Sequence, residues 1–269
     1  MEASSKLVIV RGAGDLASGT IHALVRSGWP VIALEMEMPA SIRRTVCFSE
    51  AVYDGEITVE GVTARLAASP EDALRIAGSG RAAVLVDPDC RFLEHVRPAV
   101  LVDAAMAKRN LGTRRDMATL TIALGPGFTA GVDADYVVET MRGPSLGYVL
   151  AQGTALPDTG VPGMVGGYTA ERVIHAPAGG ILRALRGIGD PIGKGETIAK
   201  IETGQRTVPV FAGISGVLRG LIRSGFPVKK GLKIADIDPR PDSVPLCYQI
   251  SDKSRRIARS VLEIIEKGV

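Results

Sequence analysis

The chain has 269 residues, of which 46% are hydrophobic and 23% are charged, so it can bury one large core or two modest ones. A net charge of +3 and an aromatic content of 4% argue against a nucleic-acid partner. The three cysteines are far apart in the sequence and lack the spacing of metal ligands, so we expect no metal site and a cytoplasmic protein. No apolar run approaches the roughly 20 residues of a membrane span, so we expect no membrane partner.

The first predicted elements form a strand–helix–strand unit. Residues 7–11 read LVIVR and predict a strand, and residues 31–35 read VIALE and predict a second, buried strand. Between them, residues 15–27 carry apolar side chains at helical spacing, and Gly28 is a natural stop. This order predicts a parallel sheet.

The rest of the first half continues with short elements. Residues 57–66 alternate around Glu60-Gly61 and predict a hairpin, and Ser69 precedes Pro70 as the cap of a helix. Further buried strands are predicted over 82–87, 99–104 and 120–124. We therefore expect residues 1–155 to form a Rossmann-like, nucleotide-binding α/β domain with a mostly parallel, doubly wound sheet.

A Gly/Pro-rich connection over 156–172 leads into an internal repeat. At an offset of 36 residues, 180–201 and 216–237 are identical at eleven of twenty-two positions. Two such halves resemble the lipoyl/biotinyl carrier domains and predict a small β-barrel over 173–240.

The hairpin tip that carries the acylated lysine in those carriers reads Gly204-Gln205-Arg206 here. We therefore expect no lipoate or biotin, and a barrel that serves as a scaffold or docking module. Residues 241–269 end in an amphipathic helix that begins after Ser251, and we expect it to dock back on the N-terminal domain.

The stretch Gly12-Ala13-Gly14-Asp15-Leu16-Ala17 fits the dinucleotide-binding pattern, directly after a strand and at the start of a helix. Its backbone N–H groups would face a pyrophosphate at the helix N-terminus. Glu35 ends the second strand at the distance where an acidic residue contacts a ribose. Alternatively, the glycines only make the crossover tight.

Other residues could complete this site. Asp15 interacts favourably with the helix dipole, but it would repel a bound phosphate unless a metal or a basic residue intervenes. Arg43 and Arg44 are the nearest basic pair in the sequence. Alternatively, Arg43 and Arg44 have no ligand and lie in a turn exposed to solvent. Gly125 and Gly127 form a second glycine-rich loop after a strand, which is either a ligand loop or an ordinary turn.

Several motifs together resemble one family. They are RGAGDLASG, PASIRRTVCFSEAVYDG, IALGPGFTAGVDADYVVETMRG, IADIDPR and SDKSRRIARSVLEII. The set is similar to the YqeB family of selenium-dependent molybdenum hydroxylase system proteins, and the likeness covers nearly the whole chain. The resemblance implies an accessory role in maturing a molybdenum hydroxylase client enzyme, with no settled reaction.

By position, the resemblance also implies functional roles for Pro126, Glu139 and Arg142. Pro144 stands where relatives tend to have histidine. The ligand implied is NAD(P), another nucleotide, or molybdopterin cytosine dinucleotide. Whether the chain forms a homo-oligomer stays open.

Two alternatives stay open beside the accessory role. One is an enzyme, either an NAD(P)-dependent oxidoreductase or a selenium/sulfur-transfer enzyme, for which Cys47 and Lys108 are the candidate groups. The other is a structural interaction protein whose glycine loop holds no ligand. No residue is assigned a catalytic role on the sequence.

Overall fold

The computed structural model describes residues 6–204 and 206–268, which divide into two compact units. The first unit contains the chain up to Pro39, Cys47–Thr159 and the segment from Ile250 onward. The second contains Ala40–Val46 and Gly160–Gln249. The boundary before the repeat therefore lies at Gly160, and a short segment from the first half of the chain belongs to the second unit.

The first unit is built on a nine-stranded sheet in the order β10-β9-β7-β6-β1-β2-β5-β4-β3. All neighbours from β9 to β4 run parallel, while β10 and β3 pair antiparallel at the two edges. The strands are β1 (Val8–Arg11), β2 (Val31–Glu35), β3 (Glu56–Val59), β4 (Val62–Leu66), β5 (Ala82–Val86), β6 (Val100–Asp103), β7 (Leu120–Leu124), β9 (Tyr136–Val138) and β10 (Val149–Leu150). A separate two-stranded sheet joins β8 (Thr129–Ala130) to β11 (Gly153–Thr154).

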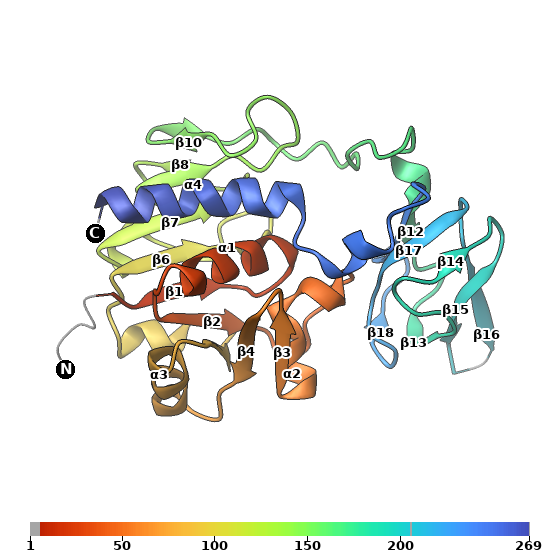
Figure 1. Cartoon of the computed structure of the whole chain (residues 1–269), viewed down its shortest axis with the longest axis horizontal. Coiled ribbons are helices and arrows are strands. Elements are labelled where there is room, and N and C mark those ends of the chain that lie inside the picture. Colours follow the sequence, from red (N-terminus) through yellow and green to blue (C-terminus); the bar gives the residue numbers. More distant parts are fainter. Residues whose placement is uncertain (1–5, 205, 269) are drawn as a thin grey trace. The chain divides into compact units, whose positions relative to one another are not determined.

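The α-helices of this unit are α1 (Asp15–Arg26), α2 (Ala51–Asp54), α3 (Pro70–Gly78) and α4 (Asp252–Gly268). α1 and α4 lie side by side along the sheet (Figure 1). They approach closely at Gly19, where an added Cβ would lie 2.8 Å from the Cβ of Ser254. α3 packs in a core with side chains of β1, β2 and β5, including Ile9, Ile32 and Ala83.

Local signals in the sequence explain several of these elements. The Glu60-Gly61 turn has φ values of +46° and +80° and joins β3 to β4 as the predicted hairpin. The Ser69 hydroxyl accepts the N–H of Asp72, so the predicted cap of α3 is confirmed. The hydroxyl of Ser251 accepts the N–H of Ser254 at the start of α4.

The predicted Rossmann-like, doubly wound domain is wrong in its regular alternation of strands and helices. The sheet is mixed, and in the described residues between β5 and β9 the helical elements are only the 3-10 turns η3 (Arg91–Glu94) and η4 (Arg115–Met117), where crossover helices were expected. Residues with positive φ interrupt both connections, Cys90 in the first and Met106, Lys108 and Gly112 in the second, and a right-handed helix cannot continue through them. α4, from the other end of the chain, contacts β7 and β9 instead.

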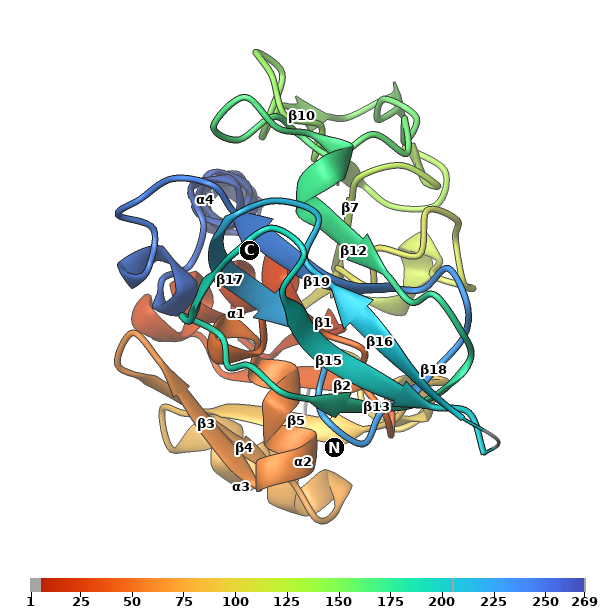
Figure 2. The same ribbon diagram turned by 90° about the vertical axis from the view of Figure 1, so that its right-hand side faces the viewer.

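The second unit contains two four-stranded antiparallel sheets, β12-β19-β17-β14 and β16-β15-β13-β18 (Figure 2). Their strands are β12 (Val173–His175), β13 (Gly180–Ala184), β14 (Pro191–Ile192), β15 (Thr197–Glu202), β16 (Thr207–Phe211), β17 (Gly216–Leu221), β18 (Pro227–Val228) and β19 (Lys233–Asp238). Short 3-10 turns lie at η1 (Arg44–Val46), η5 (Ala170–Arg172) and η6 (Pro245–Tyr248) in this unit, and at η2 (Phe48–Glu50) in the first.

The internal repeat is visible in the pairing of these strands. β13 with β15 corresponds to β17 with β19 at the same offset of 36 residues. Each short strand pairs with the other repeat, β14 with β17 and β18 with β13. The two halves therefore exchange strands and share one apolar core.

The predicted closed lipoyl/biotinyl-like barrel is wrong, because the strands form two separate sheets over one core. Among the described residues, no strand of one sheet pairs with a strand of the other. The two-residue strands β14 and β18 each end a sheet, and they offer too few backbone groups to continue it around a barrel. Gln205, at the expected carrier tip, lies outside the described residues.

Candidate functional site

The candidate site lies at the carboxyl edge of the nine-stranded sheet. β1 has β2 on one side and β6 on the other, so the direction of strand order reverses between β1 and β6. Ligands of open parallel sheets bind outside the carboxyl ends of the strands at such a switch point. The loops after β1, β6, β7 and β9 all reach this edge.

The loop after β1 leads straight into α1. Gly12 has a φ of +93°, and its N–H donates to Leu34 O at 2.7 Å. An added Cβ at Gly12 would lie 3.2 Å from Ala104 O, so the loops after β1 and β6 meet there. Gly14 is the N-cap of α1 in an extended conformation, and it offers no side chain to the first N–H groups of that helix.

Glu35 binds the loop backbone. Its Oε2 accepts the N–H of Ala13 and its Oε1 accepts the N–H of Met36, both at 2.7 Å, and the residue is 9% exposed. Burial raises the pKa of Glu35, although these two hydrogen bonds oppose the rise. The carboxylate therefore fixes the shape of the glycine loop, and its contact with a ribose stays a prediction.

Asp15 opens α1 beside the start of α4. The hydroxyl of Ser254 lies 3.3 Å from both the backbone oxygen and Oδ1 of Asp15. Two helix N-termini therefore adjoin at this edge, and each carries partial positive charge from its dipole. The side chain of Asp15 is partly exposed at this junction.

Lys253, in the first turn of α4, brings a cation to the same junction. Partial burial lowers the pKa of Lys253, and the nearby Arg142 adds to the effect, while Asp15, Glu139 and Asp158 oppose it. Among the described residues, its ammonium forms no ion pair within 4.0 Å. Nothing near position 253 in the sequence marks this lysine, because its neighbours come from distant segments.

The segment after β9 contains two of the residues that the family resemblance implies. Glu139 is 3% exposed and accepts the N–H of Met141 at 2.6 Å and of Leu156 at 2.7 Å. Arg142 makes a bidentate contact with Asp252 at 2.9 and 3.0 Å. This pair ties the segment to the start of α4.

The second glycine-rich loop packs against its neighbours. An added Cβ at Gly125 would lie 2.6 Å from the Thr140 hydroxyl, and one at Gly127 would lie 2.6 Å from the Cα of Arg109. Lys108, in the loop that Gly127 contacts, pairs with Asp158 at 2.6 Å. These glycines permit close loop packing at the carboxyl edge.

Arg43 and Arg44 lie in the second unit and bind its backbone. Arg43 donates to Leu246 O at 3.1 Å and to Gln249 O at 2.9 Å, and Arg44 donates to Leu221 O at 2.8 Å. The structure therefore brings Gly12, Gly14, Asp15, Glu35, Gly125 and Gly127 to one sheet edge, and it places Arg43 and Arg44 in a different unit.

The three cysteines are buried and unpaired with one another. Burial raises the pKa of Cys90 to about 11 and also raises that of Cys247. Cys47 is 1% exposed. Within residues 6–204 and 206–268, no group of three or more His, Cys, Asp or Glu side chains could hold a metal ion.

No helix in the described part of the chain has the length and apolar character needed to cross a membrane. Comparison with protein-family models gives no match. Among curated proteins, "Uncharacterized protein YqeB" of Escherichia coli K12 is 54% identical over 196 residues, which is 73% of this chain. The chain is a homologue of YqeB. This identity supports the family resemblance carried by the motifs.

The aligned region makes up 36% of the length of YqeB. Solved structures give weaker likenesses. A succinylglutamate desuccinylase from Silicibacter sp. TM1040 is 15% identical, with 88% of this chain and 85% of that one covered and a TM-score of 0.27. A succinylglutamate desuccinylase/aspartoacylase from Rhodobacter sphaeroides is 14% identical, with 87% and 86% covered and a TM-score of 0.30.

The ectoine utilization protein EutE (DoeB) from Ruegeria pomeroyi is 13% identical over 86% of this chain and 56% of that one, with a TM-score of 0.24. These three scores are too low to establish a common fold or to transfer an activity from the neighbours.

Proposed function

We propose that the chain binds the phosphate of a nucleotide, or of a nucleotide-bearing molybdopterin cofactor, where α1 and α4 begin side by side. The observation that carries the proposal is the contact of Ser254 with Asp15, which brings the first turn of α4, with Lys253 in it, to the start of α1. A lysine here counters the carboxylate that would otherwise repel a phosphate. The first N–H groups of α1 have no partner inside the helix and no side-chain cap at Gly14, so they favour an anion.

The biological setting of this binding rests on the YqeB resemblance. We propose an accessory factor that holds the nucleotide or cofactor during maturation of a selenium-dependent molybdenum hydroxylase. Support comes from the family motifs, which supply both helix starts: RGAGDLASG contains Asp15, and SDKSRRIARSVLEII contains Lys253. Motifs more than two hundred residues apart in sequence therefore adjoin at the proposed site.

The enzymatic alternative gains no support from its two candidate groups. Cys47 is buried, and a thiol needs access to solvent to transfer sulfur or selenium. Lys108 is held in an ion pair with Asp158. Neither side chain presents a free nucleophile to a substrate at the sheet edge.

Calorimetric titration of the purified chain tests the proposal, with NAD, ATP, CTP and molybdopterin cytosine dinucleotide as ligands. We expect one of them to bind, and Lys253→Met to weaken it by about 10-fold or more, since a charged hydrogen bond contributes about 1.5–3 kcal/mol. Lys267→Met is the matched control, because Lys267 is exposed at the far end of the same helix.

Gly14→Arg should also abolish binding, because it fills the approach to the helix N-terminus. Absence of binding by all four ligands would refute the proposal. Equal losses in Lys253→Met and Lys267→Met would place the phosphate elsewhere.

A further inference from the structure

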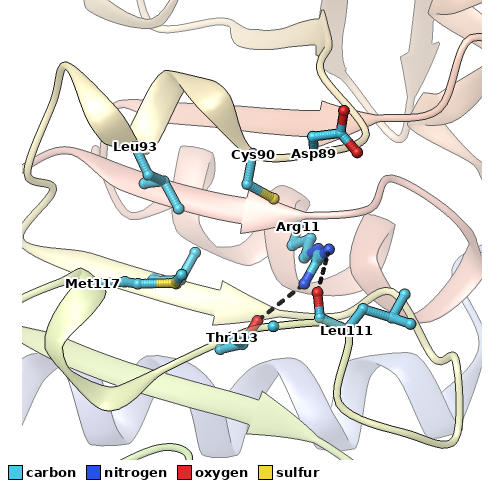
Figure 3. A pocket seen from close by; sticks show the side chains of 9 residues that line it. Arg11, Asp89, Cys90, Leu93, Leu111, Thr113 and Met117 are labelled. Atoms are coloured by element: carbon cyan, nitrogen blue, oxygen red, sulfur yellow. Dashed lines mark hydrogen bonds between the residues drawn. The ribbon is translucent and has the colours of Figure 1, made fainter.

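A second feature lies at the same sheet edge, at the carboxyl ends of β1 and β6. It is a cavity of about 30 Å³. Figure 3 shows the side chains that surround it, which come from β1, β6 and the segments around η3 and η4. The lining residues are Arg11, Asp89, Cys90, Leu93, Leu101, Leu111, Gly112, Thr113 and Met117.

Arg11 supplies the polar wall of the cavity. Its Nη1 donates to the Thr113 hydroxyl at 3.2 Å, and its Nη2 donates to Leu111 O at 3.1 Å (Figure 3). The same Nη1 lies 3.5 Å from Oδ2 of Asp103. Within the described chain, these are the acceptors of its guanidinium. The Nε–H and the second Nη2–H of Arg11 are therefore left as donors.

The charges around the cavity are already balanced. Asp103 is 2% exposed, and it accepts the Thr113 hydroxyl at 2.5 Å and the Ala105 N–H at 3.1 Å in addition to its ion pair with Arg11. Asp89, on the rim, pairs with Arg91 at 3.3 Å. The high pKa of Cys90 keeps its thiol neutral. An anionic ligand would have to compete with Asp103 for Arg11.

The remaining walls are apolar or weakly polar. Leu93, Leu101 and the thioether of Met117 surround the space beside Arg11. One water needs roughly 10–15 Å³ of such a cavity, so about 30 Å³ accepts an end group of two or three heavy atoms. A small planar group with one acceptor atom and an apolar edge matches these walls.

Cys90, on the cavity wall, has an unusual backbone conformation. Its φ is +58°, in the left-handed region that residues other than glycine, asparagine and aspartate rarely adopt. Such residues cluster at ligand sites, where the surrounding structure holds them. At Cys90 the turn is held by Asp87, whose carboxylate accepts the N–H groups of Arg91 at 2.9 Å and of Phe92 at 2.8 Å.

We propose that this cavity binds an uncharged carbonyl-bearing end group, a carboxamide or the lactam edge of a heterocycle, through one of the remaining guanidinium N–H groups of Arg11. The carbonyl oxygen accepts this hydrogen bond, and the rest of the end group contacts Leu93 and Met117. The proposal stands on the cavity alone and does not require the nucleotide site at Lys253.

Formamide and formate provide a matched pair of probes, because they are nearly isosteric and differ in charge. The chain is labelled with ¹³C at the methionine methyl groups and titrated with each probe at constant ionic strength. We expect formamide to shift the Met117 methyl signal saturably, while the exposed Met36 stays unchanged. A ligand of three heavy atoms binds no tighter than about a millimolar Kd, and we expect formate to bind at least several-fold more weakly.

Two variants test whether the Met117 shift comes from the cavity. Leu93→Phe fills the space and should abolish the shift, whereas Leu74→Phe changes an exposed leucine on α3 and should leave it intact. Arg11→Lys keeps a cation beside Asp103 but removes the planar guanidinium with its remaining donors, so it should weaken formamide binding by about 10-fold. Preserved dispersion of the other methionine signals shows that each variant is folded.

Several results would overturn the proposal. They are the absence of a saturable Met117 shift with formamide, formate binding as tight as formamide binding, and an undiminished shift in either Leu93→Phe or Arg11→Lys. Lys253→Met separates the two proposals, because it should weaken the nucleotide and leave formamide binding unchanged. A loss of formamide binding in Lys253→Met would also count against an independent cavity site.

Discussion

Ala13 donates its backbone N–H to the Oε2 atom of Glu35 over 2.7 Å, which joins the glycine loop after β1 to the end of β2. The second oxygen of the same carboxylate accepts the N–H of Met36. A residue whose position in the sequence suggests a ribose contact thus supports the loop from behind. Because both hydrogen bonds come from N–H donors, position 35 needs two acceptor oxygens, which a carboxylate has and an amide lacks.

Glu35→Gln should therefore destabilise the chain. A glutamine has one acceptor oxygen, so either Ala13 or Met36 loses its partner, at a cost of about 1–3 kcal/mol. The measurement is urea unfolding followed by circular dichroism at pH 7. Glu37→Gln, at an exposed position two residues later, should change stability by less than about 0.5 kcal/mol. Equal stabilities of the two variants would contradict the role assigned to Glu35.

The same carboxylate should make stability depend on pH. Its pKa in the folded state is raised by burial, so the native chain binds a proton more tightly than the unfolded chain. Its contribution to stability therefore falls as the pH rises from 4.5 through the folded-state pKa. This part of the pH dependence should disappear in Glu35→Gln and persist in Glu37→Gln.

Gly19→Ala should weaken the packing of α1 against α4. The added Cβ would lie 2.8 Å from the Cβ and 3.0 Å from the backbone of Ser254, so α4 would have to move. Overpacking costs about 1–3 kcal/mol, which exceeds the gain of about 1 kcal/mol in helix propensity. Gly78→Ala, at a helical position with open space, should be neutral or stabilising. A thermal midpoint for Gly19→Ala at or above that of wild type would refute the close approach.

The sequence predicts those elements whose determinants are local. The hairpin at Glu60-Gly61, the cap at Ser69 and the two halves of the repeat all depend on neighbouring residues or on identity between segments. The absence of crossover helices could not be predicted from local sequence. The helix that contacts β7 and β9 is α4, which comes from the other end of the chain. The place of Lys253 could not be predicted either, since its turn of α4 meets Asp15 only in the folded chain, where Ser254 contacts Asp15 across 239 residues of sequence.

Gly180→Ala and Gly216→Ala should be destabilising to a similar extent, because the two glycines are equivalent in the repeat. An added Cβ would lie 2.2 Å from Glu202 O in one case and 2.3 Å from Asp238 O in the other. Each strand pair would have to separate, at a cost of about 3 kcal/mol. Gly179→Ala meets Val228 O at 3.6 Å, an ordinary contact, and serves as the control for unfolding by urea. A large difference between the two repeat variants would contradict their equivalence.

Cys90 should be unreactive in the folded chain and should lower stability at high pH. Burial raises the pKa of its thiol to about 11 from 9.0, with Asp87 and Asp103 adding to the rise and Arg11 opposing it. At pH 8 the thiolate fraction is then about 100-fold smaller than in the unfolded chain. Iodoacetamide labelling, mapped to each cysteine by mass spectrometry, should modify Cys90 only after denaturation.

The effect on stability follows from the same difference in pKa. Between pH 9 and 11 the unfolded chain loses the Cys90 proton while the native chain keeps it, so stability should fall as the pH rises through this window. Cys90→Ala should show a smaller decline over the same range of urea midpoints. Rapid labelling of Cys90 in the native chain at pH 8, or identical declines in wild type and Cys90→Ala, would show that its thiol is neither buried nor perturbed.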